Sequence, residues 1–334
     1  MVVRLLVLVI CFAHFTHMFG SEHVVCREKK ILICGVCKDV AKSVPNTICN
    51  IEKLGQKFKD YAVIIYENNS KDNTAILFKQ WAARNNKVIF MSEMFTRRQL
   101  LEGIRCRRDS GEPSRMERIA IARNKTLAIA REKRFDDFDY VIMADLDFKK
   151  SWPLEAIVKT IEKGGDWDCV AANGLFRKDI YYDRFAFRDA RFPLGPELLD
   201  KKWWKEIWKE PLRFTGSRWI PVYSAFGGLA IYKRKSIIPF SYVGYVTDDL
   251  KTCYKDIIAS LSHSHMHLQK YRKLNGLPVS LSLANTQVIF RENSQLYGFY
   301  TCCEHVTLHA SMRLNGFGKI YVNPEMKLVY DLPR

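Results

Sequence analysis

Residues 140–148 read YVIMADLDF, and the rest of the chain is organised around this stretch. The first five are apolar, as in a short strand that is buried on both faces. Two carboxylates follow, Asp145 and Asp147, and side chains two residues apart on a strand point to the same side. Carboxylates held side by side repel each other unless a cation lies between them. The stretch is therefore either a strand that ends in a solvated turn, where Asp is common, or a strand that ends in a metal site.

The residues around this stretch predict strands and helices in alternation. Short apolar runs are typical of buried strands, and apolar residues three or four positions apart are typical of helices. Strands separated by helices pair in parallel through right-handed crossovers. We therefore predict an α/β domain with a mainly parallel central sheet flanked by helices. The predicted strands are 30–36, 61–66, 87–91, 140–144 and 169–172, and the predicted helices are 43–58, one through Phe78 and Trp81, 115–134 and 153–163.

The second half of the chain is less regular. Segment 241–298 shows no clear period and gives no prediction. Near the end, residues 304–314 predict a helix, and 319–322 and 326–330 predict two further strands. The basic connection 97–114 is broken by Gly and Pro, and a loop of this length in a compact domain is usually functional or mobile.

The first twenty-one residues differ from the rest of the chain. Arg4 precedes an apolar run from Leu5 to Ala13, which is too short to span a bilayer comfortably. A charged start followed by a short apolar segment is typical of a secretory signal. We therefore predict a signal peptide or a short signal anchor at 1–21. The rest of the chain is expected in the secretory pathway, exported or associated with a membrane.

The 334-residue chain has a formal net charge of +17, from 53 Lys and Arg against 36 Asp and Glu. A surplus of this size favours an anionic partner, such as nucleic acid, a phospholipid surface or a phosphorylated small substrate. The sequence has neither zinc-finger spacing nor the aromatic and basic repeat of RNA-recognition modules. We therefore expect no nucleic acid partner, and an anionic membrane surface stays among the expected partners.

Polar side chains follow two of the predicted strands at the point where each strand ends. Residues 67–74 read ENNSKDNT after the second strand, and Asp145 and Asp147 follow the fourth. In an open parallel sheet, ligands bind beyond the carboxyl ends of the strands. Mn²⁺ and Mg²⁺ prefer oxygen ligands and usually bring a substrate phosphate with them. The two clusters together favour a metal site over a solvated turn.

Several short motifs resemble those of the GT-A glycosyltransferases. Residues 67–74 are similar to the Asp-Asp-x-Ser-x-Asp-x-Thr segment of these enzymes, and residues 145–147 are similar to their Asp-x-Asp motif. The chain also contains ARN at 122–124, FGG at 226–228 and CEH at 303–305. Together these motifs, which span most of the chain, most resemble glycosyltransferase family 69, the fungal capsular α-1,3-mannosyltransferases and their relatives.

The resemblance implies an organisation and an activity. It implies one GT-A-like, Rossmann-type domain at 28–334, with a nucleotide-sugar half at 28–172 and a C-terminal acceptor half at 173–334. The implied ligands are a GDP- or UDP-sugar donor, Mn²⁺ or Mg²⁺, and a glycan acceptor. We expect a metal-dependent transferase that moves a hexose, with mannose first, to a glycan or other hydroxyl. Two alternatives stay open: a nucleotidyltransferase with a paired-Asp metal site, and a non-catalytic basic binding protein.

The resemblance also implies roles for single donor-side residues. Glu67, Asn69 and Asp72 would lie by the donor nucleotide. Asp145 would contact the ribose or the sugar as a catalytic residue, and Asp147 would bind the metal. Relatives often carry Asn-Asp where this chain has Ala-Asp, so the choice between Asp145 and Asp147 as metal ligand stays open.

Two arginines of the predicted helix 115–134 are further donor-side candidates. Arg118 and Arg123 lie five residues apart, and a guanidinium can hold a diphosphate through two hydrogen bonds. Arg123 followed by Asn is similar to the donor-facing end of this helix in GT-A enzymes. An exposed position on a basic helix is the alternative, above all for Arg118.

The acceptor-side candidates come from the second half of the chain. Gly227 and Gly228 form either a bulge or, as the resemblance implies, a place where the backbone approaches a sugar closely. Glu304 is the candidate acceptor-side carboxylate and general base. His305 and His309 share one face of the predicted helix. A late His often completes the metal site in GT-A enzymes, and His309 is the candidate here.

Overall fold

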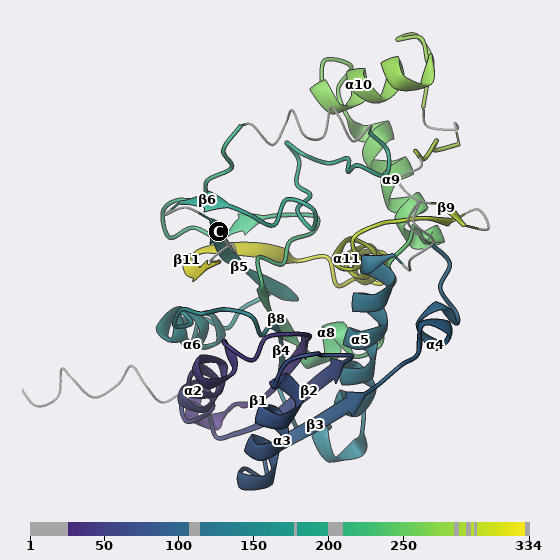
Figure 1. The fold of residues 1–334 in the computed structure, drawn as a ribbon. Helices are drawn as coiled ribbons and strands as arrows, with labels where there is room; N and C mark the ends of the chain where they lie inside the picture. Colours follow the sequence, from purple (N-terminus) through teal and green to yellow (C-terminus); the bar gives the residue numbers. More distant parts are fainter. Residues whose placement is uncertain are drawn as a thin grey trace, which may run out of the picture.

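The computed structural model describes residues 26–106, 114–176, 179–199, 210–283, 287–291, 295–296 and 299–330. The leader predicted at 1–21 lies outside these residues. A nine-stranded sheet runs through the molecule in the order β3-β2-β1-β4-β8-β5-β11-β7, with β6 paired to β5 (Figure 1). The strands are β1 Lys30–Cys37, β2 Asp60–Asn68, β3 Val88–Glu93, β4 Tyr140–Asp145, β5 Cys169–Phe176, β6 Ile180–Tyr181, β7 Ile220–Pro221, β8 Leu229–Lys233 and β11 Ile320–Val329, and a separate hairpin holds β9 Gln295–Leu296 and β10 Phe299–Tyr300.

The sheet is mainly parallel, which confirms the predicted fold class. Strand β1 pairs in parallel with β2 and with β4, and β2 pairs in parallel with β3. Strand β8 runs antiparallel between β4 and β5, and β11 runs parallel to β5. The parallel strands β1, β2 and β4 therefore end at one edge, where the polar residues of the sequence accumulate.

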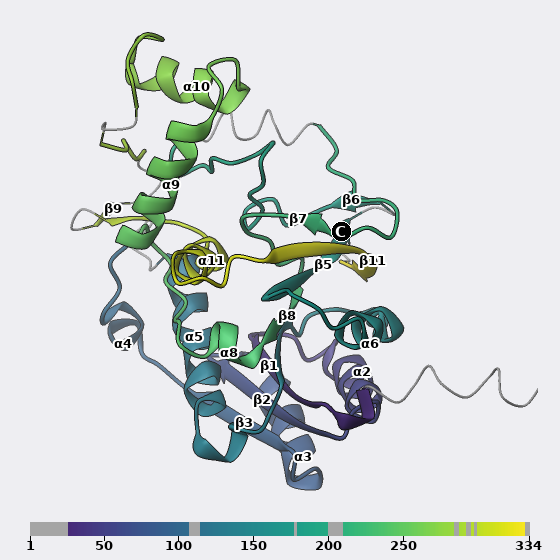
Figure 2. The same cartoon turned by 180° about the vertical axis from the view of Figure 1, so that it is seen from behind.

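Helices cover both faces of the sheet (Figures 1 and 2). Helices α2, α3 and α6 contribute to the hydrophobic core on one face, and α5, α9 and α11 contribute to the core on the other. Helices α9 and α10 project away from the sheet. The helices are α2 Val44–Gly55, α3 Thr74–Arg84, α4 Arg97–Leu101, α5 Arg115–Ala130, α6 Leu154–Glu162, α8 Arg234–Ile237, α9 Asp248–Ser260, α10 Met266–Asn275 and α11 Glu304–Leu314, with 3-10 turns η1 Cys26–Glu28 and η2 Lys133–Phe135.

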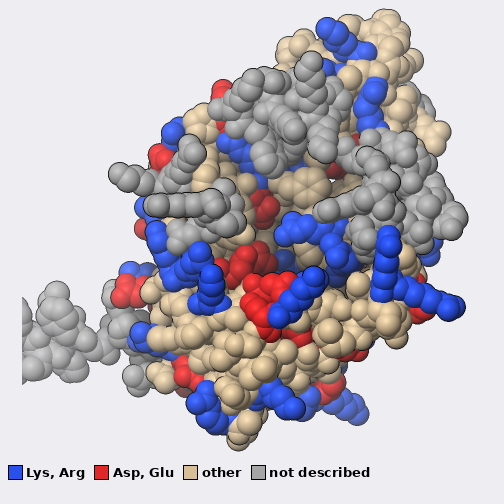
Figure 3. Space-filling view, in the orientation of Figure 1, with Lys and Arg blue, Asp and Glu red and all other residues tan. Residues whose placement is uncertain are grey.

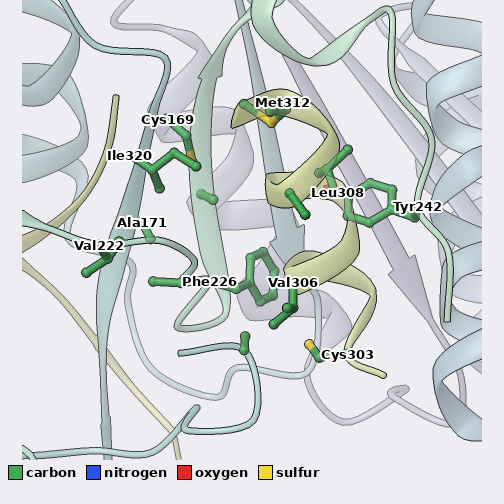
Figure 4. Packing of buried hydrophobic residues seen from close by; sticks show 14 of the residues in the cluster. Cys169, Ala171, Val222, Phe226, Tyr242, Cys303, Val306, Leu308, Met312 and Ile320 are labelled. Carbon is green, nitrogen blue, oxygen red and sulfur yellow. The ribbon is translucent and has the colours of Figure 1, made fainter. Parts of the chain in front are cut away.

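Successive side chains of the central strands enter opposite cores, because side chains alternate along a strand. In β1, Ile31 and Ile33 pack toward α2 and α3, whereas Leu32 and Cys34 pack toward α5. All four are at most 1% exposed, so residues 31–34 of β1 form a continuous apolar run that is buried on both faces. Figure 4 shows the second core around α11, where residues of β5, β8 and β11 meet the helix.

The end of the chain differs from the sequence-based prediction. The two strands predicted at 319–322 and 326–330 are one strand, β11, which has an irregularity between Asn323 and Lys327 where it pairs with β5. Pro324 lies inside this irregularity, and proline cannot donate to a ladder, so it is tolerated at a bulge. The segment 241–298, which gave no prediction, contains α9 and α10.

Candidate active site

A pocket of ≈470 Å³ lies beyond the carboxyl ends of β1 and β4. On the face shown in Figure 3, acidic side chains gather near the middle and Lys and Arg side chains lie around them. The position of the pocket agrees with the rule that ligands bind beyond the carboxyl ends of the strands in open parallel sheets. The pocket is lined by 36–40, Asn68, Leu100, Arg115, Met116, Arg118, Ile119, Ala122, Arg123, 145–147, Tyr182, Asp183, Phe185, Ala186, Phe226, 303–305 and Tyr330.

Asp147 is held in place at the pocket by atoms on two sides. Its Oδ2 accepts a hydrogen bond from the Tyr330 hydroxyl at 3.1 Å. Its main-chain oxygen accepts one from Ser43 Oγ at 3.0 Å. The other carboxylate oxygen, Oδ1, is buried and has no hydrogen-bond partner among the described residues. A buried oxygen of this kind is costly unless something binds it, so Asp147 has a ligand position to offer.

Asp145 is joined to the buried cation Arg123. Arg123 Nη2 donates to Asp145 Oδ1 at 3.0 Å, and its Nε donates to Glu304 Oε1 at 3.3 Å. The guanidinium lies 4.5 Å from the ring centre of Phe226 and 5.7 Å from that of Tyr242. Burial disfavours the charge, but Asp145 and Glu304 outweigh it and raise the pKa of Arg123. Arg123 is therefore a permanent cation that ties β4 to α11.

The carboxyl group of Asp145 is unusually basic. Its side chain is 30% exposed, yet its carboxylate sits inside the pocket. Burial raises the pKa of Asp145 from 3.8 to about 7; Arg123 opposes the rise, and Asp147, Asp183 and Glu304 add to it. Because several carboxylates share the buried cation Arg123, the pocket has an excess of negative charge, and a further cation would be bound favourably.

Glu304 and His305 begin α11 at the back of the pocket. Glu304 is 4% exposed, with Oε1 on Arg123 and Oε2 in contact with the Cys303 thiol at 3.7 Å. His305 stacks on Phe226 at 3.9 Å between ring centres, and neither of its ring nitrogens has a hydrogen-bond partner among the described residues. Burial lowers the pKa of His305 well below its usual range, so the ring is neutral.

The structure does not bring His309 to the pocket, which corrects its assignment as a metal ligand. Its Nδ1 is hydrogen-bonded with Ser224 Oγ at 2.9 Å, and its Nε2 with the Tyr232 hydroxyl at 3.0 Å. Burial lowers its pKa to about 3. One helical turn separates His309 from His305, and that turn carries it into the core beside Cys169. His309 is therefore a core histidine with both nitrogens in use.

Glu67, Asn69 and Asp72 were expected beside the donor, but their side chains form hydrogen bonds with their own loop and with the segments next to it. Glu67 is 1% exposed and accepts hydrogen bonds from Ser70 N and Ser92 Oγ, both at 2.6 Å. Asn69 has a φ of 57° and donates to the Phe95 carbonyl at 2.7 Å. These three residues thus shape the rim, and their neighbour Asn68 lines the pocket.

Asp72 connects the loops that follow β1 and β2. Its Oδ2 accepts a hydrogen bond from Ala41 N at 3.0 Å, and its Oδ1 accepts one from Thr74 N at 3.0 Å. From the other loop, Asp39 accepts a hydrogen bond from Lys71 N at 2.6 Å. The contacts run in both directions, so the two loops form one rim of the pocket.

Gly227 and Gly228 approach protein atoms, not open space. Their φ angles are 65° and 85°, a region that favours glycine. A Cβ on Gly227 would lie 2.2 Å from the Ala172 carbonyl oxygen, and one on Gly228 would lie 2.3 Å from a Phe148 ring carbon. The Gly228 carbonyl accepts a hydrogen bond from Asp145 N at 2.9 Å. The pair is thus a tight turn that positions Asp145, and neither glycine lines the pocket.

Asp183 is a pocket residue that the sequence reasoning missed. It follows β6 and accepts a hydrogen bond from Gly227 N at 3.0 Å. Burial raises its pKa to about 6, opposed by the Gly227 N–H and assisted by Glu304. The only signal in the sequence is the mixed aromatic and charged stretch 181–184, which follows no strand or helix period.

The donor set of the pocket fits a hard divalent cation. Asp145 and Asp147 supply carboxylate oxygens, the ligands that Mn²⁺ and Mg²⁺ prefer. In the part of the chain that the structure describes, no group of three or more His, Cys, Asp or Glu side chains is arranged as a complete metal cage. Few protein ligands suit a metal that also binds substrate oxygens.

The sheet, flanked by helices and with β8 antiparallel between β4 and β5, has the fold of the GT-A class of glycosyltransferases. The model of the family described as "Cryptococcal mannosyltransferase 1" matches residues 35–310, and the chain belongs to this family. The resemblance seen in the sequence is thereby confirmed. No curated protein matches the chain.

Solved structures of glycosyltransferases show remote likeness. The mannosyltransferase PcManGT from Pyrobaculum calidifontis, in complex with GDP-Man and Mn²⁺, is 12% identical at a TM-score of 0.44, over 98% of this chain and 65% of that one. S. aureus TarS 1-349 with UDP-GlcNAc is 11% identical at a TM-score of 0.41, over 91% and 60% of the two chains. The chain thus spans about two thirds of these proteins or less. Likenesses this remote carry no argument about its site.

Proposed function

We propose that the protein is a metal-dependent glycosyltransferase. It moves a hexose, with mannose first, from a GDP- or UDP-sugar to a hydroxyl of a glycan acceptor. Family membership supports the transferase activity, and the family's description as a mannosyltransferase supports the sugar. The observation that carries the proposal is the buried, unpartnered Oδ1 of Asp147 in a carboxylate-lined pocket at the carboxyl edge of the sheet.

Asp147 and Asp145 are the residues that would hold Mn²⁺ or Mg²⁺. When bound, the ion neutralises charge on the diphosphate as the bond to the sugar breaks. Asp147 offers its Oδ1, and Tyr330 fixes the orientation of that carboxylate through Oδ2. Asp145 has its Oδ1 on Arg123, so only its second oxygen is available to a cation. Asp147 is therefore the main ligand, and Asp145 assists.

Basic groups that line the pocket suit the donor diphosphate. Arg115 and Arg118 lie in the first turn of α5 and line the pocket, together with Lys38 after β1. The N-terminus of a sixteen-residue helix adds favourable partial charge for an anion. Arg123 does not share this role, because Asp145 and Glu304 occupy its guanidinium. The diphosphate is therefore assigned to Arg115 and Arg118.

A screen for donor hydrolysis tests this function. The purified chain is incubated with GDP-mannose, UDP-glucose, UDP-N-acetylglucosamine and ATP, each with Mn²⁺, Mg²⁺ or EDTA, and released nucleotide is measured by chromatography. We expect release of nucleoside diphosphate from one nucleotide sugar, and only with metal. Asp147→Asn should lower this release, and Asp179→Asn, at an exposed ion pair with Arg213, is its matched control and should not. Preference for ATP would indicate a nucleotidyltransferase, and no turnover of any donor would contradict the proposal.

A further inference from the structure

Glu304 was expected as the acceptor-side carboxylate, but its carboxylate is already engaged in contacts with buried protein groups. It is 4% exposed, and its two oxygens contact Arg123 and Cys303. Releasing Glu304 to bind a substrate hydroxyl would leave the buried Arg123 with one partner fewer, which is costly. The acceptor therefore needs another carboxylate in the pocket.

Asp183 meets this need by its place in the pocket. It lies on the wall made by Tyr182, Asp183, Phe185 and Ala186, which comes from the second half of the chain. The preceding residue, Tyr182, stacks on Tyr330 with 4.8 Å between the ring centres. The Tyr330 hydroxyl in turn donates a hydrogen bond to Asp147. A short chain of contacts thus connects the Asp183 wall to the proposed metal ligand.

The wall that carries Asp183 is rigidly anchored. Arg188 Nη1 donates to the carbonyl oxygens of Phe185 at 3.1 Å and of Phe187 at 2.7 Å. The same guanidinium pairs with Glu197 at 3.0 and 3.1 Å, and both side chains are at most 2% exposed. Asp183 itself is fixed by the N–H of Gly227. A side chain held in this way is preorganised for binding.

We propose that Asp183 is the acceptor-binding carboxylate, which takes a hydrogen bond from a hydroxyl of a sugar acceptor. The inference rests on the proposed function. The Asp183 carboxylate accepts hydrogen bonds from the backbone N–H groups of Gly227 and Ala186, and it also lines the pocket, where an ionised carboxylate keeps further acceptor capacity. A carboxylate accepts hydrogen bonds and cannot donate them when ionised, whereas a sugar hydroxyl donates readily. Asp183 therefore complements an acceptor hydroxyl next to the donor site.

Asp183→Asn reverses this complementarity with little change in shape. The N–H of Gly227 requires an acceptor, so the amide oxygen of Asn turns toward Gly227. Its NH₂ group then presents donors in place of the second carboxylate oxygen, so acceptor capacity toward the pocket and toward the N–H of Ala186 is lost. Hydrogen bonds to charged groups are worth enough that losing one lowers kcat/KM on the order of 10- to 100-fold.

The experiment compares transfer with hydrolysis in the same variant. Methyl α-D-mannopyranoside and methyl β-D-galactopyranoside are the acceptor probes, with the donor and metal found in the hydrolysis screen. For Asp183→Asn we expect a raised acceptor KM and kcat/KM for transfer at least tenfold lower, with donor hydrolysis lowered by a clearly smaller factor. Asp179→Asn is the matched control and should leave both unchanged. Asp183→Ser replaces the Asn variant if the latter melts below the assay temperature.

Three results would overturn the inference. Transfer by the variant at the wild-type rate would show that Asp183 does not bind the acceptor. An equal loss of hydrolysis and transfer would place Asp183 with the donor. A wild type that hydrolyses its donor but transfers to neither methyl glycoside would show that a sugar hydroxyl is not what this wall binds. A wild type that turns over no donor contradicts the proposed function instead.

Discussion

Arg123 sets the charge balance of the pocket. It is the buried cation between Asp145 and Glu304, and it is packed against Phe226 and Tyr242. Five carboxylates line the same pocket, namely Asp39, Asp145, Asp147, Asp183 and Glu304. Removing the cation leaves carboxylates that are buried and repel one another.

Arg123→Gln should therefore destabilise the protein by about 3–5 kcal/mol, the usual cost of breaking a buried ion pair on one side. Urea unfolding followed by circular dichroism measures this. Arg84→Gln, on an exposed position of α3, is the control, and it should change the free energy of unfolding by about 0.5 kcal/mol or less. Equal effects of the two substitutions would mean that Arg123 does not carry the charge balance.

The pKa of Asp145 predicts a pH dependence of stability in metal-free protein. Burial raises this pKa from 3.8 to about 7, against the opposing effect of Arg123. Between these two values the folded state holds a proton that the unfolded state releases, so stability attributable to Asp145 falls as pH rises from about 4 to about 7. Asp145→Asn removes this dependence.

The measurement is the melting temperature of wild type and Asp145→Asn in EDTA between pH 4.5 and 8.5. The melting temperature of the variant should rise relative to that of the wild type as pH rises to about 7. Above about pH 7 the difference between the two melting temperatures should stay constant. The buried His305 and His309, whose pKa values burial lowers, destabilise both proteins alike at acid pH. If the melting temperature of the variant instead fell relative to that of the wild type with rising pH, the pKa of Asp145 would not be raised in the folded protein.

At the scale of elements, the turn between β7 and β8 shapes two walls of the pocket. Gly227 N donates to Asp183, and the Gly228 carbonyl accepts from Asp145 N at the end of β4. Neither position tolerates a Cβ without displacing a neighbour. The turn thus sets the spacing between the proposed metal ligands and the proposed acceptor-binding wall.

Gly228→Ala separates crowding from backbone strain when it is compared with Gly316→Ala. Both glycines have a φ of 85°, but a Cβ on Gly316 meets no atom within 4 Å. Gly316→Ala should cost about 1–2 kcal/mol for the left-handed backbone alone. Gly228→Ala should cost about 1–3 kcal/mol more through its clash with Phe148 and Tyr182. Equal losses of unfolding free energy would show that the turn is not crowded.

The predicted elements were most accurate where one periodicity dominated. Helix α11 begins at Glu304 and ends at Leu314 as predicted, and β4 follows its apolar run. Strand β11 was divided in two because Pro324 interrupts its pattern, whereas parallel pairing with β5 resumes beyond the proline. Helices α9 and α10 were missed because their cores depend on partners that are distant in sequence.

The sequence predicted those site residues that lie at the ends of regular strands and helices. Asp145, Asp147 and Glu304 follow or begin regular elements, and the topology brings them together. Helical spacing placed His305 and His309 on one face but could not show that only His305 reaches the pocket. Glu67 and Asp72 carry the motif, yet their carboxylates accept hydrogen bonds from backbone and hydroxyl groups of the protein. Only the folded structure reveals such tertiary partners, Asp183 among them.

At the scale of the molecule, the charge and the leader bear on where the protein works. No helix within the described ranges is long and apolar enough to cross a bilayer. We propose that the leader at 1–21 directs the chain into the secretory pathway. The net charge of +17 then favours residence near anionic phospholipid, where each adjacent Lys or Arg contributes ~1 kcal/mol.

Expression of the full chain and of a chain that starts after residue 21 tests this proposal. Fractionation should find the full chain in membrane or secretory fractions and the shortened chain in the cytosol. Sedimentation with phosphatidylserine vesicles should recover the shortened chain at low salt and release it at high salt, because the attraction is screened. An identical cytosolic distribution for both chains would contradict the proposal that residues 1–21 direct export.

The central claim is that Asp147 binds a divalent ion together with the donor diphosphate. Calorimetric titration of Mn²⁺ into wild type and Asp147→Asn, with saturating GDP or UDP, tests it most directly, beside a melting curve for each protein. The Asn variant keeps an acceptor for the Tyr330 hydroxyl and relieves repulsion with Asp145, so its melting temperature should be unchanged or higher. Its Mn²⁺ affinity should fall on the order of 100-fold. Unchanged Mn²⁺ affinity with a lowered melting temperature would instead make Asp147 a structural residue and contradict the account.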